Sequence, residues 1–456
     1  MNPSKSRVNL TEGPVSKSIV SLMLPMMIGM VALMSYSLAD TYFVAQIGTL
    51  ELAAMSFTFP VNFIVGAIAM GIGTGVSSIV SRLFGKDEMG AVQRIATHAM
   101  MLAAILGIGV TILGLTTIYP LFTLLGADAT TLPLIERYMS IYYFGGMFLV
   151  IPMIGNSVMR ASGDAKTPAK IMSTAAVLNI ILDPILIFGV DSLGIPALGL
   201  EGAAIATVMA NIGTALASVG IIVFRDRLIR INVADLKLIW QSWKEIMHIG
   251  IPSMTSSLIA PMTTGFITWQ ISSFGQEAVA GFGVASRVEG LAMLCLMALS
   301  ASIAPFTGQN YGRGNYERVK DGIRFAYRFV LIYGLVIAAL MFVLSPYIAA
   351  AFTDDPIATS TTVMHMRMVP WSYLGLGAGM ISISAFNAIG KPMPAMWISL
   401  TRTILVYAPM AFLLAWWIGL FGVFLAAFIA NLASGSLGFI WFRSVFFNWQ
   451  PEPATA

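Results

Sequence analysis

Two aspartates carry the chemistry that this sequence suggests first. Asp40 and Asp183 both lie inside long apolar stretches, where a carboxylate is costly and usually faces a bundle interior or a water-filled cavity as part of an ion pathway. Asn179 stands four residues before Asp183, so these two side chains share one helix face. Two carboxyls in an apolar cavity can share a proton. With amide and hydroxyl oxygens they can equally hold Na⁺, because hard cations choose oxygen ligands.

Other polar side chains can converge on the same cavity. In the first half of the chain they are Asn62, Tyr138, Asn156, Thr207 and Asn211. In the second half, Glu289 aligns with Asn62 when the chain is compared with itself, so both side chains can face a central cleft and contact a substrate. A structural role is the alternative for the aspartates, because two neutral, hydrogen-bonded acids would stiffen the contacts between helices.

The elements that must position these residues are membrane-spanning helices. Hydrophobic residues make up 57% of the chain and charged residues only 10%, whereas a soluble domain carries roughly 25% charged residues. A span needs about 20 mainly apolar residues. The sequence predicts twelve spans, at 16–46, 52–82, 93–119, 133–159, 168–190, 198–224, 244–274, 278–308, 321–349, 361–388, 394–418 and 421–444.

The connections between the spans are short, and their charges alternate. Lys and Arg gather in the even-numbered connections, whereas the odd-numbered connections carry acidic residues. By the positive-inside rule, we expect a multi-pass protein of the cell inner membrane with both termini in the cytoplasm. The net charge of +4 reflects this topology, so we expect no nucleic-acid partner.

Several kinds of chemistry are disfavoured by the residue types. The single cysteine, Cys295, leaves no intramolecular disulfide and no thiolate metal site. The three histidines have no ligand spacing and the sequence holds no phosphate-binding glycine loop, so we expect no cofactor. The one metal considered is the Na⁺ that Asp40, Asn179 and Asp183 can hold. No connection is long enough for a catalytic soluble domain, and we expect no enzyme.

The chain is an internal duplication with an offset of 227 residues. Four pairs share this spacing: Pro25 and Pro252, Gly48 and Gly275, Gly85 and Gly312, and Gly163 and Gly390. Each half holds six spans and begins on the same side, which predicts an N-lobe at 1–230 and a C-lobe at 231–456. Parallel repeats of this kind are common in secondary transporters, where substrate sites lie near the bilayer midplane.

The second copy has no carboxylate at either position. Asp40 corresponds to Ile267 at the repeat offset, and Asp183 corresponds to Ala408 when a two-residue gap is allowed. The same helices can therefore be built without these acids, which favours a functional role for them in the first half.

Taken together, these residues resemble the multidrug and toxic compound extrusion (MATE) transporters. The matching motifs are Asp40 with Asn179-x-x-x-Asp183, and Asn156-x-x-x-Arg160-x-x-Gly163-Asp164 with Thr167-Pro168. The resemblance implies an all-α polytopic protein with two six-helix lobes, related by pseudo-two-fold symmetry, around a V-shaped central cleft. The seventh span from residue 246 to 274 and the tenth span at 361–388 hold no acidic residue, unlike those of NorM-like members, so the chain is more similar to DinF-like members.

The resemblance also implies a function. It implies a cation-coupled antiporter that exports amphipathic, often cationic drugs, with Asp40, Asn179 and Asp183 coupling the ion. Tyr138 and Asn156 are similar to supporting positions of the first lobe, as is Thr207. We expect H⁺ as the coupling ion with Na⁺ as the alternative, drugs and the lipid bilayer as partners, and a monomer. The rival function is a flippase for lipid-linked oligosaccharides, whose anionic substrate an acidic cavity disfavours.

Overall fold

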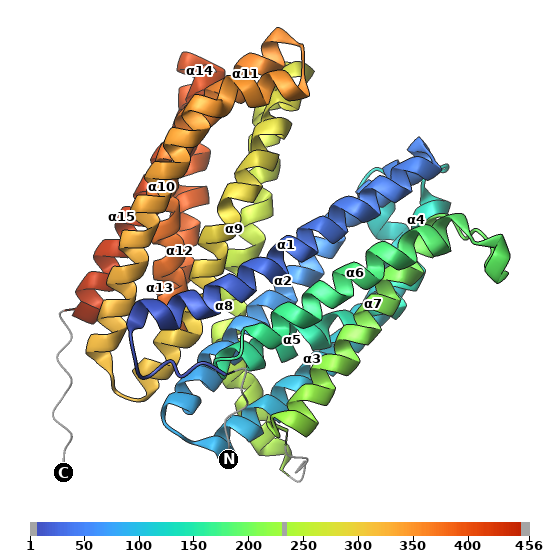
Figure 1. The fold of residues 1–456 in the computed structure, drawn as a ribbon. Helices are drawn as coiled ribbons and strands as arrows, with labels where there is room; N and C mark the ends of the chain where they lie inside the picture. The colour runs from blue at the N-terminus through green and yellow to red at the C-terminus, as the bar shows by residue number, and fades with distance from the viewer. Residues whose placement is uncertain (1–6, 230–234, 448–456) are drawn as a thin grey trace, which may run out of the picture. The chain divides into compact units, whose positions relative to one another are not determined.

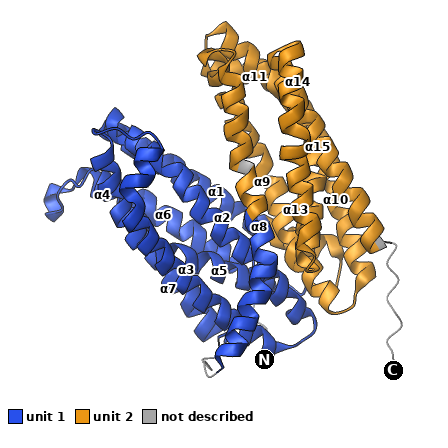
Figure 2. Cartoon of the chain, turned by 180° about the vertical axis from the view of Figure 1, so that it is seen from behind, with its two compact units in different colours: residues 1–9, 24–254 blue, residues 10–23, 255–456 orange. Residues whose placement is uncertain are grey.

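The computed structural model describes residues 7–229 and 235–447, which form helices joined by short connections (Figure 1). The chain folds into two compact units (Figure 2). Unit 1 comprises residues 1–9 and 24–254, and unit 2 comprises residues 10–23 and 255–456.

Unit 1 holds most of the first six spans. Its helices are α1 (Val15–Ile47, from residue 24), α2 (Thr49–Gly85), α3 (Met89–Leu124), α4 (Leu132–Phe144), α5 (Gly146–Ala161), α6 (Lys166–Phe188), α7 (Leu200–Gly220) and the first part of α8 (Leu236–Ser272). A 3-10 turn, η1 (Asp191–Leu193), follows α6, and a π-helical turn, η2 (Ile221–Arg225), extends α7.

Unit 2 holds the rest of α8 and the later spans. Its further α-helices are α9 (Gln276–Gly312), α10 (Tyr316–Phe352), α11 (Pro356–Met368), α12 (Tyr373–Ala388), α13 (Pro392–Leu400), α14 (Ala408–Ile418) and α15 (Leu420–Phe442). The 3-10 turn η3 (Val369–Ser372) joins α11 to α12, and the π-helical segment η4 (Thr401–Tyr407) joins α13 to α14. A second π-helical segment, η5 (Arg443–Phe447), follows α15.

The spans lie where the sequence predicts them. Among the described residues, ten helices are long and apolar enough to cross a membrane, and the bent pair of α4 and α5 adds an eleventh span. The helix α8 is 37 residues long and covers the predicted span at 244–274 except its last two residues. The all-helical fold with twelve predicted spans is therefore confirmed.

The duplication is visible in the backbone as well as in the sequence. The fourth span bends by 49° at Gly145, and the tenth span is interrupted by η3, which ends at Ser372, 227 residues after Gly145. Gly163 and Gly390 both adopt positive φ, at 90° and 79°. Glycine takes this conformation without the steric penalty of a side chain, which explains why the two halves share it here.

The two compact units divide α1 and α8 at matching places. The first nine residues of α1, Val15 to Met23, belong to unit 2, and the first part of α8, up to Met254, belongs to unit 1. Both divisions lie beside the repeat prolines Pro25 and Pro252. The units therefore differ from the predicted lobes, 1–230 and 231–456, because each unit takes the start of a helix whose remainder belongs to the other.

The first part of α8 is fixed to unit 1 by close packing. The indole Nε1 of Trp243 donates to the backbone oxygen of His98 on α3 at 2.9 Å, and Ile246 and Ile249 fill the core of the unit. A Cβ atom at Gly75 of α2 would collide with the backbone oxygen of Ile246. Small residues at such crossings let helix backbones approach closely in lipid.

Candidate functional site

Both predicted aspartates are buried in unit 1. Asp40 lies on α1 with 4% of its surface exposed, and Asp183 lies on α6 with none exposed. Their carboxyl groups are close enough for their charges to interact. The helix α6 continues through Pro184 to Phe188, so Asp183 is held on an unbroken helical element.

A hydroxyl group on α7 joins the helices that carry the two acids. Thr207 accepts a hydrogen bond from Nδ2 of Asn179 at 3.4 Å, and its hydroxyl also bonds the phenol of Tyr36 at 3.4 Å. Tyr36 lies one helical turn before Asp40 on α1, and Asn179 lies one turn before Asp183 on α6. Thr207 therefore links a neighbour of each carboxylate, across three helices of the same unit.

Tyrosine side chains from α4 complete this cluster. Tyr138 is 3% exposed and stacks on Tyr142, with ring centroids 6.2 Å apart and planes 13° apart. Both phenols are near enough to Asp40 to interact with its charge. The acids thus face polar groups that carry no charge of their own.

Several buried oxygens of this cluster have no hydrogen-bond donor among the described residues. They are Oδ1 of Asp40, both carboxyl oxygens of Asp183, and Oδ1 of Asn179. A buried acceptor without a donor is costly, so such groups need an explanation in a native fold. All four atoms are acceptors. A proton on one carboxyl would supply one donor among them, and a small cation could be coordinated by several of them at once.

No hydrogen bond joins three of the predicted cavity residues to this cluster among the described residues. Asn156 on α5 is buried and its Oδ1 has no donor within the described structure. Asn62 on α2 and Asn211 on α7 are half-buried. These residues belong to the same unit as the aspartates, and their roles stay predictions.

Glu289 belongs to a different site, in unit 2. Its Oε2 lies 3.5 Å from Nε2 of His365, and both side chains are largely buried. The histidine ring is enclosed edge-on by Phe282 and Phe424. Arg402 is near enough to act on the charge of Glu289. Unit 2 therefore has its own acidic centre, built from residues other than the repeat counterparts of the aspartates.

The counterparts themselves are apolar, as the sequence comparison indicates. Ile267 packs beside the cluster of Tyr407, Ala411, Ala426 and Ala430. This packing shows that the repeated helices close without a carboxylate at this position.

Sequence reasoning missed three residues of the two sites. Tyr36 and Tyr142 could have been found, because each lies four residues from a candidate, Asp40 or Tyr138, on the same helix. His365 could not, because no spacing in the chain connects it to Glu289, which lies on another helix.

The geometry now defines a class of protein. A duplicated bundle of membrane-spanning helices, with ionisable groups buried where apolar packing would suffice, is the architecture of a secondary transporter.

The family follows from comparison with known proteins. The MatE family model matches residues 25–185 and 252–413, and the two matches begin 227 residues apart. The chain belongs to this family, whose members are transporters and not enzymes. A FAD transporter from Shewanella oneidensis is 36% identical over 432 residues, covering 94% of this chain and 95% of that protein. The multidrug export protein MepA from Staphylococcus aureus is 26% identical and covers 92% of both chains.

Solved structures show the same fold. The MATE transporter VcmN from Vibrio cholerae, in its bent form, has a TM-score of 0.88 and 30% identity, covering 95% of this chain and 97% of that one. A MOP superfamily transporter from Pyrococcus furiosus has a TM-score of 0.89 and 28% identity, covering 98% and 99% of the two chains.

Proposed function

We propose that this MATE transporter is a proton-coupled antiporter that exports amphipathic, often cationic compounds. The observation that carries the proposal is the group of buried, unsatisfied oxygens on Asp40, Asn179 and Asp183. Export of small molecules is supported by the 26% identity to MepA, which is named a multidrug export protein.

In this proposal, ion and drug are coupled through charge. When the carboxyls are ionised, the site in unit 1 attracts a cationic compound. Protonation of Asp40 or Asp183 removes that attraction. It also turns a hydrogen-bond acceptor of the cluster into a donor, and the hydrogen bonds of Thr207 to Tyr36 and Asn179 connect α1, α6 and α7 at this point. Entry of one positive charge along the membrane potential supplies about 2.3 kcal/mol per 100 mV. This can drive export of a compound without net charge, or of a monovalent cation when more than one proton enters for each.

The subfamily and the setting are part of the same proposal. Asp40 and Asp183 lie in unit 1, whereas the seventh span from residue 246 to 274 and the tenth span hold no acidic residue, and this supports a DinF-like member. The alternation of charged connections supports an inner-membrane protein with cytoplasmic termini. One chain holds both halves of the duplication, which supports a monomer.

Na⁺ is the alternative coupling ion. Four unsatisfied oxygens and the hydroxyl of Thr207 make an oxygen-rich donor set, which is the chemistry a hard cation selects. A proton needs only one of the carboxyl oxygens. We favour the proton because the described residues offer a cation few ligands beyond the two carboxyls, namely Asn179 and Thr207.

Export of an anionic dinucleotide is a second candidate function. The observation that favours it is the 36% identity to the Shewanella FAD transporter, against 26% for MepA. The acidic cluster opposes it, because an ionised carboxylate pair repels a pyrophosphate. FAD measured in the medium of cells with and without the transporter tests this candidate directly.

The decisive experiment is drug efflux from membrane vesicles under an imposed proton gradient, with and without Na⁺. We expect efflux to need the proton gradient and to be insensitive to Na⁺. Asp40→Asn and Asp183→Asn should abolish it, whereas Asp191→Asn, which removes an exposed carboxylate beyond the end of α6, should not. Undiminished efflux in both buried-site variants would refute the assignment of the coupling site. Efflux driven by a Na⁺ gradient alone would show that Na⁺, and not the proton, is the coupling ion.

A further inference from the structure

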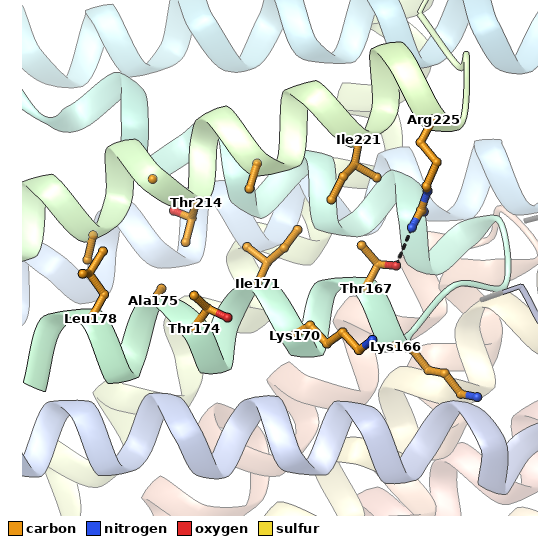
Figure 3. Close-up of a pocket in the computed structure, with 13 residues that line it drawn as sticks. Lys166, Thr167, Lys170, Ile171, Thr174, Ala175, Leu178, Thr214, Ile221 and Arg225 are labelled. Atoms are coloured by element: carbon orange, nitrogen blue, oxygen red, sulfur yellow. Dashed lines mark hydrogen bonds between the residues drawn. The ribbon is translucent and has the colours of Figure 1, made fainter. Parts of the chain in front are cut away.

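A groove runs between α6 and α7 on unit 1, with a volume of about 680 Å³. Figure 3 shows Lys166, Lys170 and Arg225 at one end of it and Leu178 at the other. Its remaining lining is mostly small or apolar, with three threonine side chains: Thr167, Ile171, Thr174, Ala175, Ala210, Gly213, Thr214, Ala217 and Ile221. The groove is thus basic at the helix ends and apolar within the span.

The arginine at the basic end is already neutralised. Arg225 donates to Oδ2 of Asp164 at 2.7 Å and to both carboxyl oxygens of Asp226, at 2.9 and 2.8 Å. Asp226 also pairs with Arg7 at 3.3 Å, and both carboxylates are fully buried. The charges of the two arginines and the two aspartates therefore cancel, and this cluster adds no net charge to the basic end of the groove.

The two lysines supply the remaining charge. Lys166 and Lys170 lie one helical turn apart on α6, both exposed, and neither forms an ion pair with a described residue. Their ammonium groups are therefore available to an anion. Basic pockets between transmembrane helices on the cytoplasmic side bind anionic lipid headgroups.

The length of the groove fits one leaflet of a bilayer. From Lys166 to Leu178, α6 rises about 18 Å, and half of the hydrocarbon core is about 15 Å thick. Apolar side chains of α7 and η2 are strongly exposed, with Leu216 at 67% and Phe224 at 81%. Exposed apolar surface of this kind within a span is in contact with lipid chains.

We propose that this groove binds an anionic phospholipid, with its phosphate on Lys166 and Lys170 and an acyl chain along α6 and α7. A zwitterionic lipid fits less well, because its own cationic group opposes the lysines. The inner end of the groove reaches Leu178, next to Asn179, and Ala210, one turn from Thr207. The lipid therefore packs on the two helices whose contact holds the acidic cluster.

The test is the lipid preference of the purified full chain. The protein is reconstituted in nanodiscs of mixed phosphatidylglycerol and phosphatidylcholine, and the lipids retained after detergent extraction are counted by native mass spectrometry. We expect Lys166→Gln and Lys170→Gln each to reduce the preference for phosphatidylglycerol by about fivefold. Lys86→Gln, an exposed lysine of the same unit outside the groove, should leave the preference unchanged.

A second pair of variants tests the apolar part of the groove. A side chain at Gly213 points toward Leu178, whose Cδ2 would lie 4.0 Å from the new Cβ, whereas Gly220 on the same helix has no atom within that range. Gly213→Leu should displace the retained lipid, and Gly220→Leu should not. The comparison of Gly213→Leu with Gly220→Leu still tests the proposal even if the lysine variants fail to fold.

Three results would overturn the proposal. Lys86→Gln could lower the preference as much as the groove variants, which would show a general surface charge effect. Soluble glycerol phosphate could displace the retained lipid completely, which would show a site for free anions. Equal retention of both lipids in the unaltered protein would show no headgroup selection at all.

Discussion

The side-chain amide of Asn179 donates a hydrogen bond to the hydroxyl oxygen of Thr207 over 3.4 Å, and the same oxygen contacts the phenol of Tyr36. One hydroxyl thus connects three helices beside two buried carboxyls. Protonation of Asp40 or Asp183 changes the hydrogen bonding of the residue one turn before it, Tyr36 or Asn179. Because both of these residues bond Thr207, the change is transmitted to α7 through this hydroxyl.

The first prediction removes that hydroxyl. Thr207→Val keeps the shape of the side chain but leaves Asn179 and Tyr36 without this partner, at about 0.5–1.5 kcal/mol for each hydrogen bond. We expect efflux to fall about two- to tenfold, as measured in vesicles under a proton gradient. Thr207→Ser should restore most of the activity.

The matched control lies on the same helix. Among the described residues, the hydroxyl of Thr214 bonds only the backbone oxygen of Asn211, within its own helix. Thr214→Val should therefore leave efflux unchanged. Equal loss in both variants would show that any threonine of α7 matters for packing, and the linking role of Thr207 would be lost.

The sequence was sufficient to predict the spans and the position of the acids. Apolar stretches of membrane length leave little choice but helices, and the repeat offset aligned Asp40 with an apolar residue of the second copy. Four-residue spacing predicts neighbours on one helix, as for Asn179 and Asp183. It says nothing about contacts between helices, because those depend on how the helices cross.

The contacts that could not be predicted are all contacts between different helices. The hydrogen bond from Asn179 to Thr207 and the pairing of Glu289 with His365 each join residues of separate helices. The division of α1 and α8 between the two units was also out of reach. The sequence of an apolar helix indicates how long the helix is. It does not indicate which compact unit each turn of the helix packs against.

The second prediction concerns close packing in unit 1. Gly75 faces the backbone oxygen of Ile246, so even a methyl group must displace backbone. We expect Gly75→Ala to destabilise the protein by about 1–3 kcal/mol, seen as a lower melting temperature in detergent. Gly90→Ala, where no atom lies within 4 Å, should be neutral or slightly stabilising. A reversed order of the two melting temperatures would contradict the packing.

The third prediction compares a buried ion pair with an exposed one. The carboxylate of Asp164 is fully buried and accepts from Arg225 at 2.7 Å and from the hydroxyl of Thr167, also at 2.7 Å. Hydrogen bonds to a charged group contribute about 1.5–3 kcal/mol, so Asp164→Ala should lower the melting temperature clearly.

An exposed pair provides its control. Glu317 and Lys320 lie 2.7 Å apart, but the side chain of Glu317 is 77% exposed. Such pairs contribute about 0–1 kcal/mol, so Glu317→Ala should change the melting temperature little. If both variants had the same melting temperature as the unaltered protein, the buried ion-pair network around Arg225 would not stabilise unit 1.

The fourth prediction separates the two acidic centres. If ion coupling belongs to unit 1, Glu289→Gln should preserve proton-driven transport, because Asp40 and Asp183 are untouched. The substitution leaves His365 without its acidic neighbour at 3.5 Å, so we expect a change in apparent affinity for some drugs rather than in coupling. The measurement is the number of protons moved per drug, with a pH-sensitive dye inside the vesicles. Loss of proton movement in Glu289→Gln, with coupling intact in Asp183→Asn, would transfer the coupling centre from unit 1 to unit 2.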